Sequence, residues 1–249
     1  MLVIGKSPDW APGKVRRIQD DIRLLISRTL SFDSTFLWLC EILLFCTKAS
    51  DVAVAQKRFR GLLKPAKETA SQIESLAQIC LGDSESFDNV KGYTAEELAY
   101  QIMAKLLPGW TSVRNARFEN QEGPVCGASN LDVFFGRGEY NRHQVQLMID
   151  GDQESNGFEI KCSLRSWLTC DGHMRSESRK KLAFMKCLKA ICPSMNVCLV
   201  TLETGEDVKA SEKTITEHGY GCIGVVSVRD LHNRLKKTVG RSGISFPPL

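Results

Sequence analysis

The sequence predicts a mixed fold class, α/β or α+β, with a mixed central sheet flanked by helices. Short apolar runs rich in β-branched and aromatic residues recur after residue 92, and such runs are typical of strands. Segments with helical spacing separate some of these runs, which favours strands covered by helices. The chain has 249 residues, enough for one large domain or for a small and a medium one.

A polar segment rich in turn-forming residues, 83–92, divides the chain. Before it the pattern is helical, because apolar residues recur at three- and four-residue spacing within 15–26 and 73–81. We therefore predict a helical region at residues 1–90 and a second region, which carries the strands, at residues 91–249.

The second region is predicted to open with a helix whose first turn has a capping box, Thr94-Ala-Glu-Glu97. The capping box gives a structural reason for Glu97 but none for Glu96. The predicted elements, in order, are a helix at 94–107, strands at 112–119, 130–136, 143–150 and 157–164, a basic helix at 176–190, strands at 195–203 and 221–228, and a helix at 229–238.

The strand predicted at 157–164 carries the chemistry. With a period of two, Glu159 and Lys161 lie on one face, and apolar residues occupy the other. An acid and an amine on such an apolar strand cost desolvation energy unless they are paired or bind something charged. Asp132 alternates in the same way with Leu131 and Val133. Two carboxylates and a lysine on neighbouring strands are what a Mg²⁺-dependent phosphodiesterase needs.

The acid strand followed by the strand with Glu159 and Lys161 resembles the PD-(D/E)xK nuclease superfamily. This superfamily includes most type II restriction endonucleases and the archaeal Holliday-junction resolvases. Glu159-Ile-Lys161 looks like the ExK element, and Asp132 looks like the acid that precedes it. Gly92-Tyr-Thr-Ala-Glu96 is similar to the GxxxE helix of that fold, and Cys126-Gly-Ala-Ser129 resembles the turn before the acid strand. The resemblance covers residues 92–228 and implies a restriction-endonuclease-like core.

Asp150 competes with Asp132 for the place of the metal-binding acid. No proline precedes Asp132, and the segment between it and Glu159 contains another apolar run, which ends at Asp150. A hairpin about residues 152–156 would bring Asp150 nearly opposite Glu159. We favour Asp132 because the small-residue turn before it matches the resemblance.

The helix predicted at 176–190 is basic and would lie next to this site. Its charged residues include Arg179, Lys180 and Lys181, with Arg175 just before them, and Leu182, Met185 and Leu188 form its apolar stripe. A basic helix beside a metal site would follow a phosphate backbone. These four basic residues are the predicted DNA contacts.

Composition excludes several other classes. The net charge is only +4, so any attraction of a polyanion depends on local clustering. The most apolar segment, 36–45, is too short to span a bilayer, residues 1–8 lack the pattern expected of a signal peptide, and no phosphate-binding glycine loop is found. No Cys-x-x-Cys occurs, and most cysteines, among them Cys46, Cys187, Cys198 and Cys222, lie in apolar runs. We expect buried thiols in a cytoplasmic protein without a nucleotide cofactor.

The function that the resemblance implies is a Mg²⁺-dependent endodeoxyribonuclease of the type II restriction kind. It would cut double-stranded DNA at a specific sequence as a homodimer and leave a 5′-phosphate, with residues 1–90 serving recognition or dimerisation. Asp132 and Glu159 would bind the metal, Lys161 would act on the nucleophile or the developing charge, and Glu96 would assist a second metal. Two alternatives stay open: a structure-specific repair or Holliday-junction-resolving nuclease, and a non-catalytic DNA-binding protein with a relic nuclease fold.

Overall fold

The chain forms two units. The computed structural model describes residues 1–6 and 84–238, apart from 121, 128, 143, 145 and 151, together with residues 23, 40, 41, 43–46, 51 and 54. The first unit comprises Met1–Asp9 and Met103–Leu249, and the second comprises Trp10–Ile102. Most of the region predicted as helical at 1–90, including most of its basic residues, lies outside the described residues.

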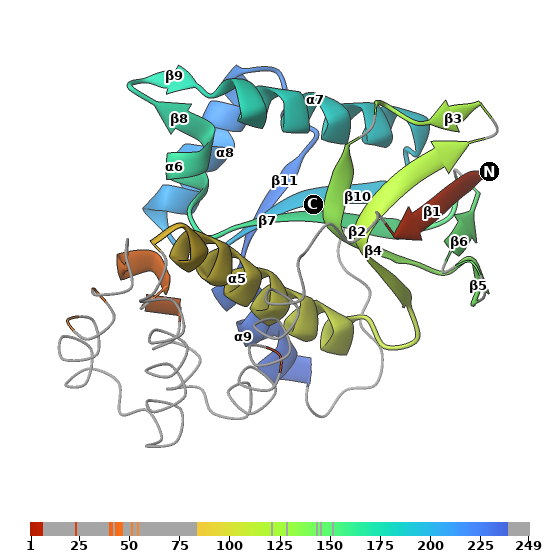
Figure 1. The fold of residues 1–249 in the computed structure, drawn as a ribbon, viewed down its shortest axis with the longest axis horizontal. Helices are drawn as coiled ribbons and strands as arrows, with labels where there is room; N and C mark the ends of the chain where they lie inside the picture. Colours follow the sequence, from red (N-terminus) through yellow and green to blue (C-terminus); the bar gives the residue numbers. More distant parts are fainter. Residues whose placement is uncertain are drawn as a thin grey trace. The chain divides into compact units, whose positions relative to one another are not determined.

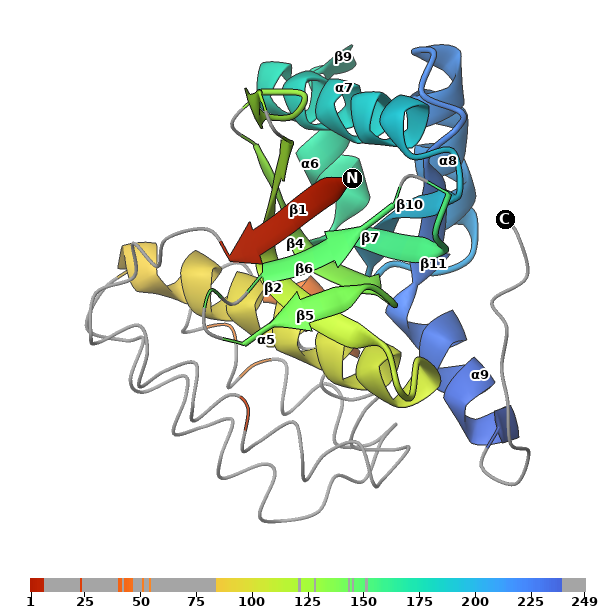
Figure 2. The ribbon, with the colours of Figure 1, turned by 90° about the vertical axis from the view of Figure 1, so that its right-hand side faces the viewer.

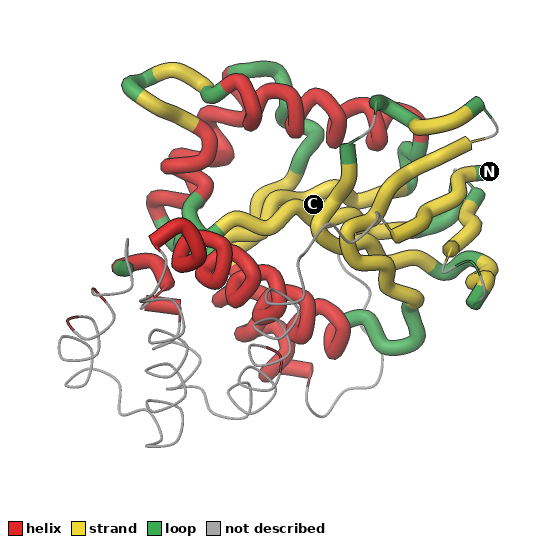
Figure 3. The backbone as a smooth tube through the Cα atoms, in the orientation of Figure 1, coloured by secondary structure: helices red, strands yellow, loops and turns green. Residues whose placement is uncertain are grey.

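A mixed sheet forms the centre of the first unit (Figures 1 and 3). In the described part of the chain this sheet has nine strands, in the order β11-β10-β7-β4-β2-β1-β6-β5, with β3 paired to β2. Their bounds are β1 (Leu2–Lys6), β2 (Thr111–Asn120), β3 (Gly123–Pro124), β4 (Asn130–Gly136), β5 (Glu139–Asn141), β6 (Gln146–Ile149), β7 (Ser155–Lys161), β10 (Met195–Thr201) and β11 (Gly224–Ser227).

Both kinds of strand pairing meet at β7. On one side β7 pairs with β10 in parallel, and β10 pairs with β11 in the same sense. On the other side β7 pairs antiparallel with β4. Parallel neighbours need long crossover connections, which explains the helices that separate β7, β10 and β11 in the sequence.

Helices cover both faces of the sheet (Figures 1 and 2). On one face lie α6 (Leu164–Leu168), α7 (Ser176–Ile191) and α8 (Glu206–Glu217), and on the other lies α9 (Val228–Thr238). A small hairpin of β8 (Thr169–Cys170) and β9 (His173–Met174) connects α6 to α7. The mixed class predicted from the sequence is confirmed at this level.

Aromatic contacts hold α7 against the sheet. Phe118 of β2 packs edge-on against Phe134 of β4, with ring centroids 5.6 Å apart, and against Phe184 of α7, at 6.1 Å. The predicted apolar stripe of α7 (Leu182, Met185, Leu188) is fully buried in the same core cluster. Edge-to-face pairs add to the stability that burial of the rings provides.

Three local predictions are wrong. Residues 2–6 form the strand β1, paired with both β2 and β6, although the region before residue 90 was predicted to be helical. Residues 84–92 belong to helix α5 (Ser84–Leu106) and do not form a turn-rich link. Consequently Thr94 is not an N-cap: it is buried in the interior of α5, and so is Glu97.

Gly157 provides a test of the packing between β4 and β7. A Cβ atom at this position would lie 2.5 Å from Leu131 Cδ1 and 3.7 Å from Met195 Sδ. We expect Gly157→Ala to lower the free energy of unfolding by about 1–3 kcal/mol through overpacking. Adding Leu131→Val should restore part of the loss, as measured by urea unfolding.

Gly5→Ala is the matched control for this substitution. Gly5 is also a strand glycine of the same sheet, but a Cβ there would meet Gln146 Cγ at an ordinary 3.7 Å. We expect a change within about 0.5 kcal/mol. Equal losses in the two variants would contradict the overpacking explanation.

Candidate active site

The strands β4 and β7 part at the end of β4 that carries Asp132. Their ladder runs from Gly136–Ser155 to Val133–Phe158 and stops there. The next backbone donor of β7, the Ile160 N–H, is accepted by Asp132 Oδ2 at 2.6 Å. A carboxylate therefore takes the place of a ladder acceptor, which satisfies a buried backbone group and fixes the Asp132 side chain in the opening.

The backbone of β2 is also irregular at this position. Asn115, which falls opposite Asp132 in the register, has a positive φ of 50° and makes no ladder pair, whereas Arg114 and Ala116 on either side are paired. Asn115 Oδ1 accepts a hydrogen bond of 3.4 Å from the Asn130 side chain. Regular backbone pairing is thus interrupted on both sides of β4 near Asp132.

Glu159 and Lys161 enter the same opening from β7. The Glu159 side chain is only 2% exposed, and its Oε1 lies 2.7 Å from Lys161 Nζ. Lys161 Nζ also lies 3.6 Å from Asp132 Oδ2. Asp132, Glu159 and Lys161, which the sequence predicts as a set, are therefore brought together by direct contacts.

A second lysine completes the cluster. Lys181 Nζ of α7 lies 3.0 Å from Glu159 Oε2 and donates to the Asn130 carbonyl at 2.8 Å. The ammonium groups and carboxylates alternate in the order Asp132, Lys161, Glu159, Lys181. With all four charged, their formal charges sum to zero.

Burial dominates the electrostatics of Glu159. It raises the pKa of the Glu159 carboxyl above its ordinary value of 4.5, and Asp132 raises this pKa further, whereas Lys161 and Lys181 lower it. The net direction is upward, because two ammonium groups do not fully replace the lost hydration of a carboxylate that water barely reaches.

The remaining predicted DNA contacts differ from Lys181. Arg175, Arg179 and Lys180 are exposed on the N-terminal part of α7, whereas the Lys181 side chain is only 18% exposed and turned toward Glu159. We therefore assign Lys181 to the acid–lysine cluster and keep the other three as predicted phosphate contacts.

Asp150 lies in another part of the sheet. It follows β6, which pairs with β1 and β5, so the hairpin that would have brought it opposite Glu159 does not form. The Asp150 side chain is exposed, and its main chain closes a turn with Gln153. The structure thus places Asp150 after a strand that pairs with β1 and β5, whereas Asp132 contacts β7; the choice of Asp132 as the metal-binding acid stays a prediction.

Glu96 belongs to α5 in the second unit, where it is half-buried and helps to raise the pKa of Tyr93, after burial as the main cause. Its role at a second metal stays a prediction. The adjacent Glu97 accepts from Gln101 Nε2 at 2.9 Å and lies 3.7 Å from Arg23 Nε. Glu97 is thus a buried, paired acid of that unit and not a helix cap.

Two residues that the sequence did not single out support the cluster. The indole of Trp167 on α6 lies under Lys161, with Nζ 5.8 Å from the ring centroid. Glu203, just after β10, is buried and accepts from the Ser163 hydroxyl and from the Leu164 N–H at 2.9 Å. A carboxylate at a helix N-terminus is stabilising, so Glu203 fixes the start of the helix that carries Trp167.

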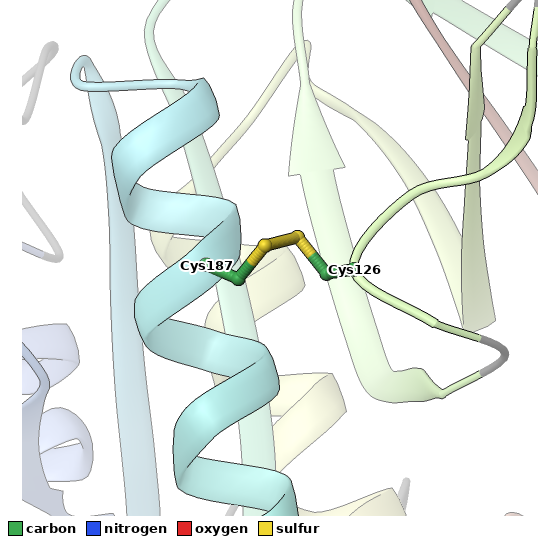
Figure 4. Close-up of a disulfide and its surroundings, with 2 residues drawn as sticks. All are labelled: Cys126 and Cys187. Carbon is green, nitrogen blue, oxygen red and sulfur yellow. A yellow bond between two sulfur atoms is a disulfide. The ribbon is translucent and has the colours of Figure 1, made fainter.

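A disulfide also ties α7 to the turn before β4 (Figure 4). Cys126 and Cys187 are bonded, with Cα atoms 5.9 Å apart and a sequence separation of 61. The prediction of a thiol at Cys187 is therefore wrong, since no local spacing signals such a distant pair. Cys222 is exposed, but Cys46 and Cys198 are buried thiols as predicted, and burial raises the pKa of Cys198 to about 12.

Comparison with known proteins matches no family model, no curated protein and no solved structure. In the described part of the chain, no three histidine, cysteine or acidic side chains are grouped so that they could hold a metal ion. None of the helices described there has the length and hydropathy that a membrane span requires. What the site can do follows from its two carboxylates and two ammonium groups.

The raised pKa of Glu159 gives a pH test. The folded chain binds this proton more tightly than the unfolded chain, so stability from this group is present at low pH and is lost as pH rises through the raised pKa. Glu159→Gln has no proton to lose. We expect the free energy of unfolding of this variant, minus that of the natural chain, to increase with pH above about 4.5, by at most about 1.4 kcal/mol per pH unit.

Urea unfolding of both proteins at matched pH values between 5 and 8 measures this difference. Groups elsewhere titrate equally in the two chains and cancel. A difference that stays constant between pH 5 and 8 would mean that the lysines outweigh burial and that the pKa of Glu159 is not raised.

Proposed function

We propose that this protein is a Mg²⁺-dependent endonuclease that hydrolyses phosphodiester bonds of double-stranded DNA. The observation that carries the proposal is the contact chain of Asp132, Lys161 and Glu159 where β4 and β7 part. Two carboxylates and a lysine, from two adjacent strands, supply ligands for a hard cation and a positive group beside it. The resemblance to PD-(D/E)xK nucleases, read from the same residues, points to the same chemistry.

The donor set fits a hydrated magnesium ion. Mg²⁺ is commonly held by one or two carboxylates and keeps several water ligands, so Asp132 and Glu159 suffice without a third side chain. Asp132 and Glu159 repel each other, and after burial this repulsion is the next cause of the raised pKa of Glu159. A cation held by both would relieve this repulsion. It would have to share Glu159 with two ammonium groups, which limits its affinity.

The roles of the residues follow from their positions. When bound, the metal supplies a polarised phosphate and a more acidic attacking water. Lys161, held by Glu159 and within 3.6 Å of Asp132 Oδ2, would neutralise charge that develops on the phosphate or orient the water. Trp167 beneath its ammonium keeps Lys161 at this place.

DNA would be held by α7. Arg175, Arg179 and Lys180 are exposed within two helical turns of Lys181, whose ammonium contacts Glu159. Phosphates bound by these residues would therefore lie close to the acid pair. Cleavage of both strands at one sequence, as in type II restriction endonucleases, would further require a two-fold dimer and a palindromic site. We keep this specificity as part of the proposal. The cytoplasmic location stays a prediction, and the Cys126–Cys187 disulfide argues against it, because disulfides are rare in a reducing compartment.

A second candidate function is DNA binding without catalysis. It is favoured by the lysine contacts to both oxygens of Glu159, since a closed network of this kind can be purely structural. A structure-specific or junction-resolving nuclease would share the site and differ in the DNA that it prefers. Digestion of unmethylated phage DNA with Mg²⁺ separates these functions: discrete bands indicate sequence-specific cleavage, and preference for a branched substrate indicates a resolving nuclease.

Substitutions of Asp132 and Lys161 test whether this site is catalytic. We expect Asp132→Asn and Lys161→Ala each to slow Mg²⁺-dependent cleavage by about 100-fold or more, because each removes a group that acts at the reacting phosphate. Asp150→Asn is the matched control and should cleave at the natural rate. Cleavage is followed on plasmid DNA with Mg²⁺ and with a chelator, and circular dichroism checks folding. A folded Asp132→Asn variant with the natural rate would exclude this site.

The basic residues of α7 make a separate prediction. Replacing Arg175, Arg179 and Lys180 with Gln should weaken binding to every DNA sequence alike and flatten the plot of log affinity against log salt by about one unit per lost contact. Cleavage should keep its sites, because phosphate contacts position the duplex without reading it. Anisotropy titrations with Ca²⁺ in place of Mg²⁺ measure the slope. An unchanged slope would exclude α7 from the DNA path.

A further inference from the structure

Lys181 points toward the sheet, whereas Arg179 and Lys180 of the same helix are exposed. Its ammonium reaches two acceptors that belong to different strands: the carbonyl of Asn130, where β4 begins, and Oε2 of Glu159 on β7. These are the two strands whose ladder stops at Val133–Phe158. Lys181 therefore bridges the opening in which the acid pair lies.

This bridge acts on the orientation of the Glu159 carboxylate. Lys161, two residues away on the same strand, contacts Oε1 of this carboxylate at 2.7 Å. With that contact alone the carboxylate could rotate about its last side-chain bond, because such terminal torsions are broad. The contact of Lys181 with Oε2 fixes the second oxygen and thereby the plane of the group.

The helix that carries Lys181 is itself anchored to the segment before β4. The disulfide joins Cys187, six positions after Lys181, to Cys126, four positions before Asn130. α7 is thus attached at two points to the same short stretch of chain, once by a covalent bond and once by Lys181. The ammonium is delivered to Glu159 by a helix whose position is constrained independently of the acid pair.

We propose that Lys181 is a positioning residue of the nuclease site, an inference that rests on the proposed function. Lys181 holds the Glu159 carboxylate in one orientation and, as a cation in contact with that carboxylate, lowers the affinity of the acid pair for a metal ion. Lys181 therefore weakens metal binding but speeds DNA cleavage. Loss of Lys181 makes the metal bind more tightly and makes cleavage slower.

The test compares Lys181→Met with the natural chain in three measurements. Cation affinity without DNA is measured by the luminescence of bound terbium, excited by energy transfer from tryptophan. Loss of this signal in Trp167→Phe would show that the terbium ion is bound near Trp167. We expect this affinity to rise about tenfold, since one ammonium in contact with the carboxylate is removed. Mg²⁺-dependent cleavage should show a kcat reduced by about tenfold or more with little change in KM for DNA. The salt slope of DNA binding should stay the same.

Further variants separate positioning from charge and from folding. Lys181→Arg keeps the charge and should restore most of the turnover with near-natural cation affinity. Lys181→Gln retains a donor for the Asn130 carbonyl and should repeat the changes of Lys181→Met if the latter does not fold. Lys186→Met is the matched control, because Lys186 lies on the same helix and donates to a backbone carbonyl, that of Gly219, at 3.0 Å. It should leave turnover and cation affinity unchanged.

The outcomes separate this inference from the proposed function. A folded Lys181→Met variant with natural turnover and a flatter salt slope would show that Lys181 contacts phosphate, and the inference would be wrong. Cation affinity that falls or stays constant would also overturn it. Terbium binding by the natural chain without any Mg²⁺-dependent cleavage would reject the proposed function, and the rise in affinity in Lys181→Met would still support the positioning role. Neither binding nor cleavage by the folded natural chain would reject both.

Discussion

The burial of the Glu159 carboxylate is the constraint on which the arrangement of this unit depends. A carboxylate that is 2% exposed loses almost all of its hydration, a cost of several kcal/mol, and contacts within the protein must offset it. Lys161 from the same strand and Lys181 from α7 provide these contacts, so α7 has to cross the sheet where β4 and β7 part. The same requirement explains why the helix is anchored there twice, since removal of one partner would leave a buried charge uncompensated.

An opening in the middle of a sheet is tolerated here because β7 has another neighbour. The parallel ladder between β7 and β10 continues to Lys161–Thr201, three residues beyond the last pair of β7 with β4. Glu159 and Lys161 therefore project from a strand that stays fully paired on one side, and Asp132 replaces the missing hydrogen bond on the other. Side chains on regular elements are held more precisely than those on loops, so the parting of two strands brings Asp132 beside Lys161 and Glu159 without loosening these groups.

Local patterns predicted the elements whose burial is evident in the sequence. β4 was predicted with its observed bounds, and the basic helix differs from α7 by one residue, because both combine a buried face with clear boundaries. β1 was missed because its partners, β2 and β6, are more than a hundred residues away. α8 was missed because it is polar, with Ser211 and Ile215 as its buried residues. Thr94 fitted a capping box, but burial of its surroundings inside α5 overrode the local preference.

The part of the site that lies on one strand could be predicted from the alternation of apolar and charged residues. Glu159 and Lys161 share a face by periodicity alone, whereas pairing of Asp132 with β7 is a long-range fact that only the resemblance suggested. Lys181 shows the limit most clearly, because three successive basic residues look alike in sequence, and only Lys181 adjoins the buried stripe of Leu182 and Met185. Because the Lys181 side chain points toward Glu159, its charge adds to that of the proposed active site. With all four groups charged, the cluster carries no formal net charge, so it does not attract phosphate by itself. On the proposed function, attraction of DNA then comes from the exposed charges of α7, and the metal supplies positive charge at the point of cleavage.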